Sequence, residues 1–181
     1  MIYIMRHGQT NWNITKKLQG RTDIPLNENG REMARIAKEK YKHTHFDICY
    51  VSPLSRARET AEIFLDGRNI PIIVDERLTE MSFGEFEGLD NAPSQTHLSV
   101  STLFKDPVNF KASKDGESLE DLYKRTKSFI DEIIIPAKTK NIDLLVVAHG
   151  ALNLSIINQI NEIPLEHFWD NLPANCEIFE I

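Results

Sequence analysis

The chain of 181 residues has little cysteine, no excess of positive charge and no long hydrophobic run. Its two cysteines, Cys49 and Cys176, lie in apolar segments, so we expect buried free thiols and no disulfide framework. No apolar run approaches the roughly 20 residues that span a bilayer. The N-terminal apolar stretch meets Arg6 too early for a signal peptide. These absences predict a cytoplasmic protein with no membrane partner.

The net charge of −6 argues against a nucleic-acid partner, because general nucleic-acid binders are normally basic. Hydrophobic residues make up 41% of the chain and charged residues 27%, which is the balance of an ordinary globular protein. The length fits a single domain over residues 1–181, with no internal repeat. Any anion site must therefore be a local concentration of arginines within an acidic molecule.

Short apolar runs alternate with amphipathic segments along the chain. Strands are expected at residues 1–5, 48–51, 70–74, 144–148 and 176–181. Between them, helical spacing is seen at Met33, Ile36, Ala37 and Tyr41, then after Ser55, from Ser118 onward, and after Gly150. Pro136 should end or kink the helix that begins at Ser118 near Ile135. The alternation predicts an α/β fold, a three-layer α/β/α sandwich with a mostly parallel central sheet. The C-terminal strand would leave an exposed edge, so a homodimer stays open.

Residues 81–116 interrupt this alternation with many polar and turn-forming residues and few periodic apolar positions. A structureless loop of that length is unusual in a compact domain. We therefore expect a small, partly helical lid insertion over the strand ends. Its aromatic and aliphatic residues hint at a leaving group with some apolar surface: Phe83, Phe86, Leu103, Phe104 and Phe110.

Two expected strands end in the same way, the first in Arg6-His7-Gly8 and a later one in His149-Gly150. Ligands of open α/β sheets bind at the carboxyl ends of the strands. A neutral histidine nitrogen can attack phosphorus, and an arginine offers a planar fork of donors to phosphate oxygens. Two such junctions in one small domain predict a phosphate site.

Two further segments carry candidate chemistry. Arg56 falls in the first turn of a helix that follows a strand, where free backbone amides already favour an anion. We expect Arg58, two residues on, to be solvated. Three carboxylates, Glu80, Glu85 and Glu87, lie close together, and any of them could be tuned to protonate a leaving alkoxide. Spacing alone does not choose among them.

In their order along the chain, these motifs resemble those of the histidine phosphatase superfamily, also called the phosphoglycerate mutase-like family. The matching segments are residues 6–13, 18–30, 52–61, 78–88, 115–118 and 148–150. The resemblance covers nearly the whole chain, and the combination of motifs is highly specific.

The resemblance implies a role for each matching residue. His7 would be the nucleophile that becomes phosphohistidine, and Glu80 would be the general acid that later activates water. Arg6, Arg56 and His149 would hold the phosphoryl oxygens, with His149 a charged or hydrogen-bonding stabiliser. Further phosphate-binding positions would be Asn13, Gln19, Gly20 and Gly150. Such a cradle supplies the electrostatic stabilisation that phosphoryl transfer requires, so neither a metal nor a cofactor is expected.

Within the family, the chain resembles the phosphatases more than the mutases. Gln19-Gly20 is similar to the phosphatase pattern, and the insertion has no arginine pair, with only Lys105, Lys111 and Lys114 as cations. We expect a phosphomonoester hydrolase that acts on a small phosphorylated metabolite and releases inorganic phosphate. A cofactor-dependent mutase and a non-catalytic phosphate-binding module are the alternatives. The substrate stays open among sugar phosphates, phosphoserine, nucleotide-pathway phosphates, α-ribazole phosphate and other small phosphomonoesters.

Two other hydrolase classes fit poorly. A cysteine-dependent phosphatase needs a shorter spacing than the six residues between Cys49 and Arg56, and Cys49 lies inside a strand. A metallohydrolase would need clustered histidine and carboxylate ligands. His43 and His45 lie close together beside lysines in a connecting loop, where we expect them to be solvated.

Overall fold

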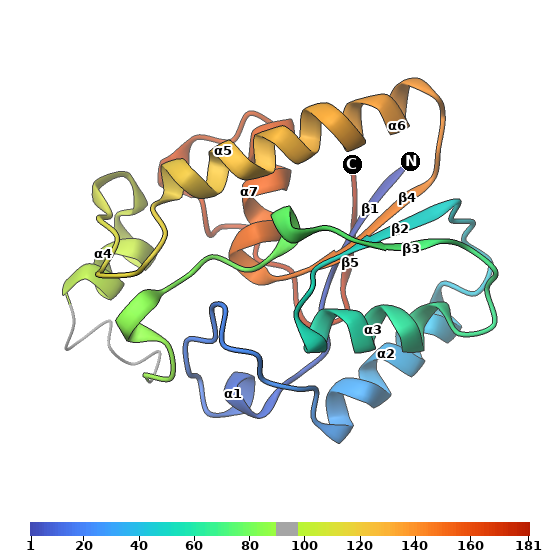
Figure 1. Ribbon diagram of the computed structural model, residues 1–181, viewed down its shortest axis with the longest axis horizontal. Helices are drawn as coiled ribbons and strands as arrows, with labels where there is room; N and C mark the ends of the chain where they lie inside the picture. The colour runs from blue at the N-terminus through green and yellow to red at the C-terminus, as the bar shows by residue number, and fades with distance from the viewer. Residues whose placement is uncertain (90–97) are drawn as a thin grey trace.

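The computed structural model describes residues 1–89 and 98–181, which form a five-stranded sheet covered by helices on both faces (Figure 1). The strands run in the order β3-β2-β4-β1-β5. β5 is antiparallel to β1, and every other pairing is parallel. The predicted mostly parallel α/β sandwich is therefore confirmed. The strand bounds are β1 Ile2–Arg6, β2 Ile48–Val51, β3 Ile72–Val74, β4 Leu144–Ala148 and β5 Ile178–Glu180.

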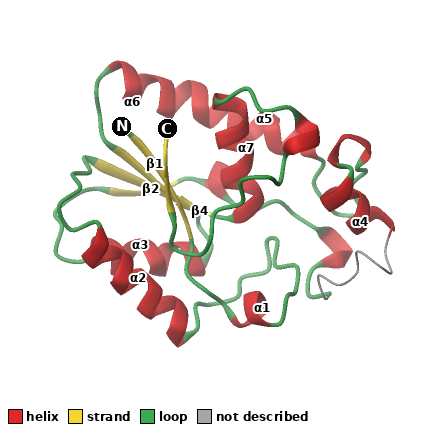
Figure 2. Ribbon diagram, turned by 180° about the vertical axis from the view of Figure 1, so that it is seen from behind, coloured by secondary structure: helices red, strands yellow, loops and turns green. Residues whose placement is uncertain are grey.

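Each face of the sheet carries its own layer of helices and its own apolar core. Helices α2 (Glu28–Lys40) and α3 (Ser55–Leu65) pack on one face, where Phe46 and Phe64 are buried. Helices α5 (Leu119–Phe129), α6 (Ile135–Thr139) and α7 (Gly150–Ile160) pack on the other. Figure 2 shows the same two layers from behind. Because β4 lies between both layers, all five of its residues are buried, which explains its unbroken apolar sequence.

Side-chain caps fix where two of these helices begin. The Asn27 side chain accepts a hydrogen bond from the Gly30 amide at 2.8 Å, and that of Ser118 accepts one from the Asp121 amide at 3.0 Å. Ser118 was the predicted start of α5. In α2, Ile36 lies in the predicted helical segment, but its side chain is 60% exposed.

The helix that follows Ser118 changes its hydrogen-bond pattern near Ile135, where the sequence predicts an end or a kink. After α5 the chain forms a π-helical turn over Ile130–Ile134 and then α6, with Pro136 in the first turn of α6. Proline lacks an amide hydrogen and collides with the carbonyl four residues earlier in a regular α-helix. The wider π turn directly before Pro136 changes that hydrogen-bond pattern, so the helix continues to Thr139.

The predicted insertion is partly helical in the residues that the structure describes. It contains the 3₁₀ turns η2 (Gly84–Phe86) and η4 (Pro107–Asn109) and the helix α4 (Leu98–Lys105). In Figure 1, α4 lies beyond the N-terminal end of α5. Residues 90–97 of the insertion lie outside the described ranges. Val100 and Leu103 are buried, so α4 is anchored to the rest of the molecule.

Two predictions from absences can be compared with the fold. Cys49 and Cys176 are both free and buried, as expected. Every helix within residues 1–89 and 98–181 is too short or too polar to cross a bilayer.

The two ends of the chain lie side by side (Figures 1 and 2). The amide of Ile2 donates to the carbonyl of Ile181, and the amide of Ile181 donates to the carbonyl of Ile2.

Candidate active site

The carboxyl ends of β1, β4 and β2 lie next to one another and place the two predicted histidines together. Register pairs Arg6 with Ala148. The His7 amide donates to the Ala148 carbonyl at 2.9 Å, and the Ser52 amide donates to the Val147 carbonyl at 3.1 Å. The ring centroids of His7 and His149 are consequently 5.2 Å apart. Ser52, which the sequence motif contains but whose role we did not predict, follows the third strand at the same edge.

The His7 ring is buried and oriented by its own backbone neighbour. Its Nδ1 lies 2.7 Å from the carbonyl oxygen of Gly8. Burial and the nearby charges of Arg56 and Arg6 hold the pKa of His7 well below its usual value, so the ring is neutral at neutral pH. A neutral ring has one N–H, which Nδ1 must donate to this acceptor. Nε2 therefore carries a free lone pair, as a nucleophile requires.

Two arginines direct positive charge into the same region. Arg56 is fully buried, and its Nη1 and Nη2 donate to the carbonyls of Thr22 at 2.9 Å and Gly20 at 2.7 Å. Burial lowers the pKa of Arg56 to about 10, so it remains charged at neutral pH. Nη1 of Arg6 donates to the Pro173 carbonyl at 2.9 Å. The Nε atoms of both arginines are buried without a hydrogen-bond partner.

Glu87 fixes the loop whose carbonyls hold Arg56. Its carboxylate accepts hydrogen bonds from the amides of Arg21 and Thr22, each at 2.9 Å, and from the Thr22 hydroxyl. Gly20 in that loop has φ +54°, and a Cβ there would lie 2.1 Å from Glu87 Oε1. Glu87 is therefore a structural clamp. Glu85 is exposed to solvent.

Glu80 is the carboxylate that reaches the start of α7, the helix that follows His149. It is 8% exposed, and its Oε1 accepts from the amides of Met81 at 2.8 Å and Leu152 at 3.0 Å. Its Oε2 accepts from the Ala151 amide at 3.2 Å, so the group caps the N-terminus of α7. A Cβ on Gly150 would lie 3.7 Å from this Oε2 and 3.8 Å from Cζ of Arg6. The structure thus separates Glu80 from Glu85 and Glu87, which sequence spacing could not do.

A cavity of about 110 Å³ opens above these groups. Eight of the predicted site residues line it: Arg6, His7, Asn13, Gln19, Gly20, Arg56, Glu80 and Gly150. Asn13 and Gln19 are both held by Thr10, whose amide donates to Asn13 Oδ1 and whose hydroxyl donates to Gln19 Oε1, each at 2.9 Å. Arg58 is exposed, as predicted, and lies outside this lining.

His149 differs from the other predicted residues because it lies behind the cavity and has no exposed surface. Its Nε2 is 2.7 Å from Ser52 Oγ, and its buried Nδ1 has no partner. Burial and the charge of Arg56 hold the pKa of His149 well below its usual value. The ring is thus neutral in this structure, which favours the hydrogen-bonding role over the charged one.

The cavity also contains residues that sequence reasoning did not assign to the site. Lys17, Trp169 and Leu172 are among them. Phe83 and Phe104, which the sequence analysis associated with the leaving group, also line the cavity. Trp169 and Leu172 follow the 3₁₀ turn η6 (Leu165–His167), far along the chain from the motifs. Trp169 and Leu172 belong to none of the sequence motifs, so only the tertiary structure shows that they line the cavity.

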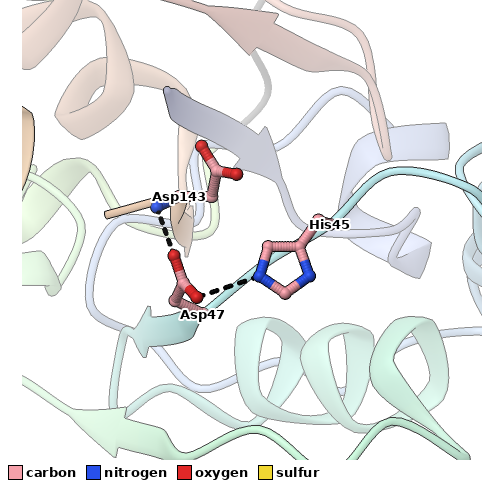
Figure 3. A group of neighbouring side chains, drawn as sticks. All are labelled: His45, Asp47 and Asp143. Atoms are coloured by element: carbon pink, nitrogen blue, oxygen red, sulfur yellow. Dashed lines mark hydrogen bonds and ion pairs between the residues drawn. The ribbon is translucent and has the colours of Figure 1, made fainter. Parts of the chain in front are cut away.

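A second cluster of titratable side chains lies at the opposite end of the sheet, where His45, Asp47 and Asp143 come together (Figure 3). His45 Nε2 lies 2.9 Å from Asp47 Oδ1, the Asp143 amide donates to Asp47 Oδ2 at 2.7 Å, and the Met1 amine pairs with Asp143 at 2.6 Å. The pKa of Asp47 is held below its usual value, mainly by the hydrogen bond from the Asp143 amide and, to a smaller extent, by the one with His45. These bonds connect the amino ends of β1, β2 and β4, so we interpret the group as structural. His43 and His45 are exposed, as predicted.

Comparison with known proteins agrees with this geometry. Residues 2–181 match the model of the histidine phosphatase superfamily, branch 1, and the chain belongs to that family. It is 31% identical to 2,3-bisphosphoglycerate-dependent phosphoglycerate mutase 2 of Gloeobacter violaceus, over 92% of this chain and 78% of that protein. It is 34% identical to a provisionally named phosphoserine phosphatase 2 of Hydrogenobacter thermophilus, over 99% of this chain and 88% of the relative.

A solved structure resembles the fold over nearly its full length. The mycobacterial glucosyl-3-phosphoglycerate phosphatase in complex with VO₃ superposes with a TM-score of 0.86 at 25% identity. The match covers 98% of this chain and 90% of that one. Proteins named as phosphatases and as mutases thus both occur among the relatives, and the family alone does not choose between the two reactions.

Proposed function

We propose that this chain hydrolyses small phosphomonoesters through a phosphohistidine formed on His7. The observation that carries the proposal is the neutral, buried His7, whose Nε2 is free beside two arginines and one carboxylate. A neutral imidazole can attack phosphorus, and the arginines neutralise charge on the phosphoryl oxygens. Because the guanidinium groups supply this charge, we propose a metal-independent reaction.

The proposed reaction has two displacements at phosphorus. In the first, His7 Nε2 forms the N–P bond as the ester O–P bond breaks, and Glu80 donates a proton to the departing alkoxide. In the second, Glu80, now a carboxylate, removes a proton from water, whose oxygen attacks phosphorus. The N–P bond then breaks, which restores the lone pair of His7 and releases inorganic phosphate.

The leaving-group side of the cavity favours hydrolysis over mutase chemistry. Among the described residues that line the cavity, Lys17 is the one cation besides Arg6 and Arg56. The three lysines of the insertion, Lys105, Lys111 and Lys114, are not part of its lining. A mutase must hold a substrate that carries both a phosphoryl group and a carboxylate, and it must retain that substrate between two transfers. One lysine is a weak basis for such retention.

The test measures phosphate release from p-nitrophenyl phosphate and a panel of phosphomonoesters by the full chain, with a chelator present. Turnover that disappears in His7→Ala supports the proposal. Tight phosphate binding without turnover would identify a binding module instead. Interconversion of phosphoglycerates that outpaces phosphate release, in the presence of 2,3-bisphosphoglycerate, would identify a mutase.

A further inference from the structure

Beyond the phosphoryl end, the cavity lining combines polar and apolar residues. The polar residues Asn13, Lys17 and Gln19 come from the segment around α1 (Asn11–Ile14). The apolar residues include Phe104, Trp169 and Leu172, which together are called the apolar wall below. None of the three side chains of the apolar wall carries a charge, and only the indole N–H of Trp169 can donate a hydrogen bond.

That one donor is already used inside the protein. Trp169 Nε1 donates to the carbonyl of Leu103 in α4 at 2.7 Å. The indole also packs against Phe104, with centroids 4.7 Å apart, and meets Phe168 edge-on at 4.9 Å. These three contacts hold the ring in one orientation. The apolar wall is therefore preformed and offers no hydrogen bond to a hydroxyl-rich leaving group.

The apolar wall starts directly beside the reacting groups. Leu172 is 43% exposed, and a Cβ on Gly150 would lie 3.2 Å from its Cδ1. The same Cβ would lie 3.7 Å from Glu80 Oε2, so Leu172 and the general acid flank one residue. The first carbons of a leaving group protonated by Glu80 would therefore meet Leu172 and then the rings of Trp169 and Phe104.

Resting on the hydrolysis proposed above, we propose that the substrates are phosphomonoesters of alcohols with an apolar body. An aromatic ring or hydrocarbon chain of the alcohol packs on Trp169, Leu172 and Phe104. Removal of such a body from water is favourable in proportion to its apolar area. A polyol of equal size would lose water contacts without gaining partners along this wall.

The experiment compares esters whose alcohols have similar basicity, so that the chemical step is matched. The full chain is assayed with 3-phenylpropyl phosphate, propyl phosphate and glycerol 1-phosphate. We expect kcat/KM for the phenylpropyl ester to exceed that for the propyl ester by about tenfold, and glycerol 1-phosphate to be no better than the propyl ester. Trp169→Ala and Leu172→Ala should each bring the phenylpropyl-to-propyl ratio toward one.

Two further variants separate wall contact from structural damage. Trp169→Phe keeps an aromatic face but loses the bond to Leu103, so it should retain most of the ratio. Ile135→Ala removes a comparably exposed apolar side chain, 50% exposed on α6 and outside the cavity lining, so it should leave the ratio unchanged. Thermal denaturation of each variant monitors folding.

The possible failures are distinguishable. No turnover of any phosphomonoester would overturn the hydrolysis on which the inference rests. Turnover with equal kcat/KM for the propyl and phenylpropyl esters would overturn the inference alone. So would a preference that persists in both Trp169→Ala and Leu172→Ala, or a clear preference for glycerol 1-phosphate.

Discussion

Nδ1 of His7 lies 2.7 Å from the carbonyl oxygen of Gly8, the residue that follows it in the chain. The contact fixes the tautomer of a neutral ring, so we predict that phosphorylation occurs on Nε2 and never on Nδ1. Quenching the enzyme during turnover and recording the ³¹P and ¹⁵N spectra of the trapped protein identifies the nitrogen. The bound phosphoryl group should be lost in acid and should be absent from His7→Ala. An adduct on Nδ1, or a phosphoryl group retained in that variant, would contradict the assignment.

Arg56 and Arg58 lie two residues apart on α3 but differ completely in burial, since Arg56 is fully buried and Arg58 is exposed. We predict that Arg56→Ala lowers kcat/KM by roughly 2–4 kcal/mol of transition-state stabilisation, about 30- to 1000-fold. Arg58→Ala is the matched control and should change kcat/KM less than twofold. Initial rates with p-nitrophenyl phosphate provide the comparison. Similar losses in both variants would place the phosphoryl site elsewhere.

Local sequence order predicted the strand-end groups well, because parallel strands bring their carboxyl ends to one edge whatever the chain between them does. His7, His149 and Arg56 needed only the strands and one helix start. Glu80 could not be separated from Glu87 in this way. The difference depends on which carboxylate reaches the amides of α7 and which reaches the loop around Thr22, and both contacts join segments distant in sequence. Trp169 was missed for the same reason.

The end or kink predicted near Ile135 falls at the boundary between the π turn and α6, but the π turn itself was not predicted. A proline-based expectation assumes that the preceding turn is α-helical. Here a π turn precedes Pro136, and its residues Ile130 and Ile134 are packed into the core. Such a local change of hydrogen-bond period leaves no signal in apolar spacing. The start of the same helix at Ser118 was predictable, because its cap involves a residue only three positions away.

Glu80 and Glu87 have different hydrogen-bond partners, so their glutamine variants should fail in different ways. Glu80→Gln loses the transferable proton, and we predict a steep fall in activity on alkyl phosphates with a smaller fall in the single-turnover release of p-nitrophenol. Glu87→Gln turns one oxygen into a donor facing donors of the loop, and we predict a lower melting temperature with no altered dependence on the leaving group. Glu85→Gln, at an exposed position, is the control for both. Leaving-group dependence that changes in Glu87→Gln and not in Glu80→Gln would refute the assignment of the acid.

The bond of 2.7 Å between His149 Nε2 and Ser52 Oγ predicts that Ser52 positions His149. The Ser52 oxygen also accepts from the Leu54 amide at 3.3 Å, so two contacts hold the serine side chain beside the ring. Ser52→Ala should change the ¹⁵N shifts of His149 toward a tautomer mixture and lower kcat by about 2- to 10-fold. Unchanged shifts with reduced stability would mean that Ser52 acts through packing alone.

The two buried, neutral histidines predict a specific loss of stability in mild acid. Burial holds the pKa of His7 and of His149 well below the usual value of about 6.5, which each regains when the chain unfolds. The unfolded chain therefore binds protons first, so the free energy of unfolding falls as pH drops below about 6.5 and continues to fall toward the folded pKa values. Urea denaturation of the ligand-free protein between pH 7.5 and 5.5 measures this slope. His7→Asn should flatten it, because one of the two groups is removed, whereas His43→Asn, at an exposed position, should preserve it. If both variants keep the wild-type slope, His7 is not the neutral, buried nucleophile that the proposed reaction requires.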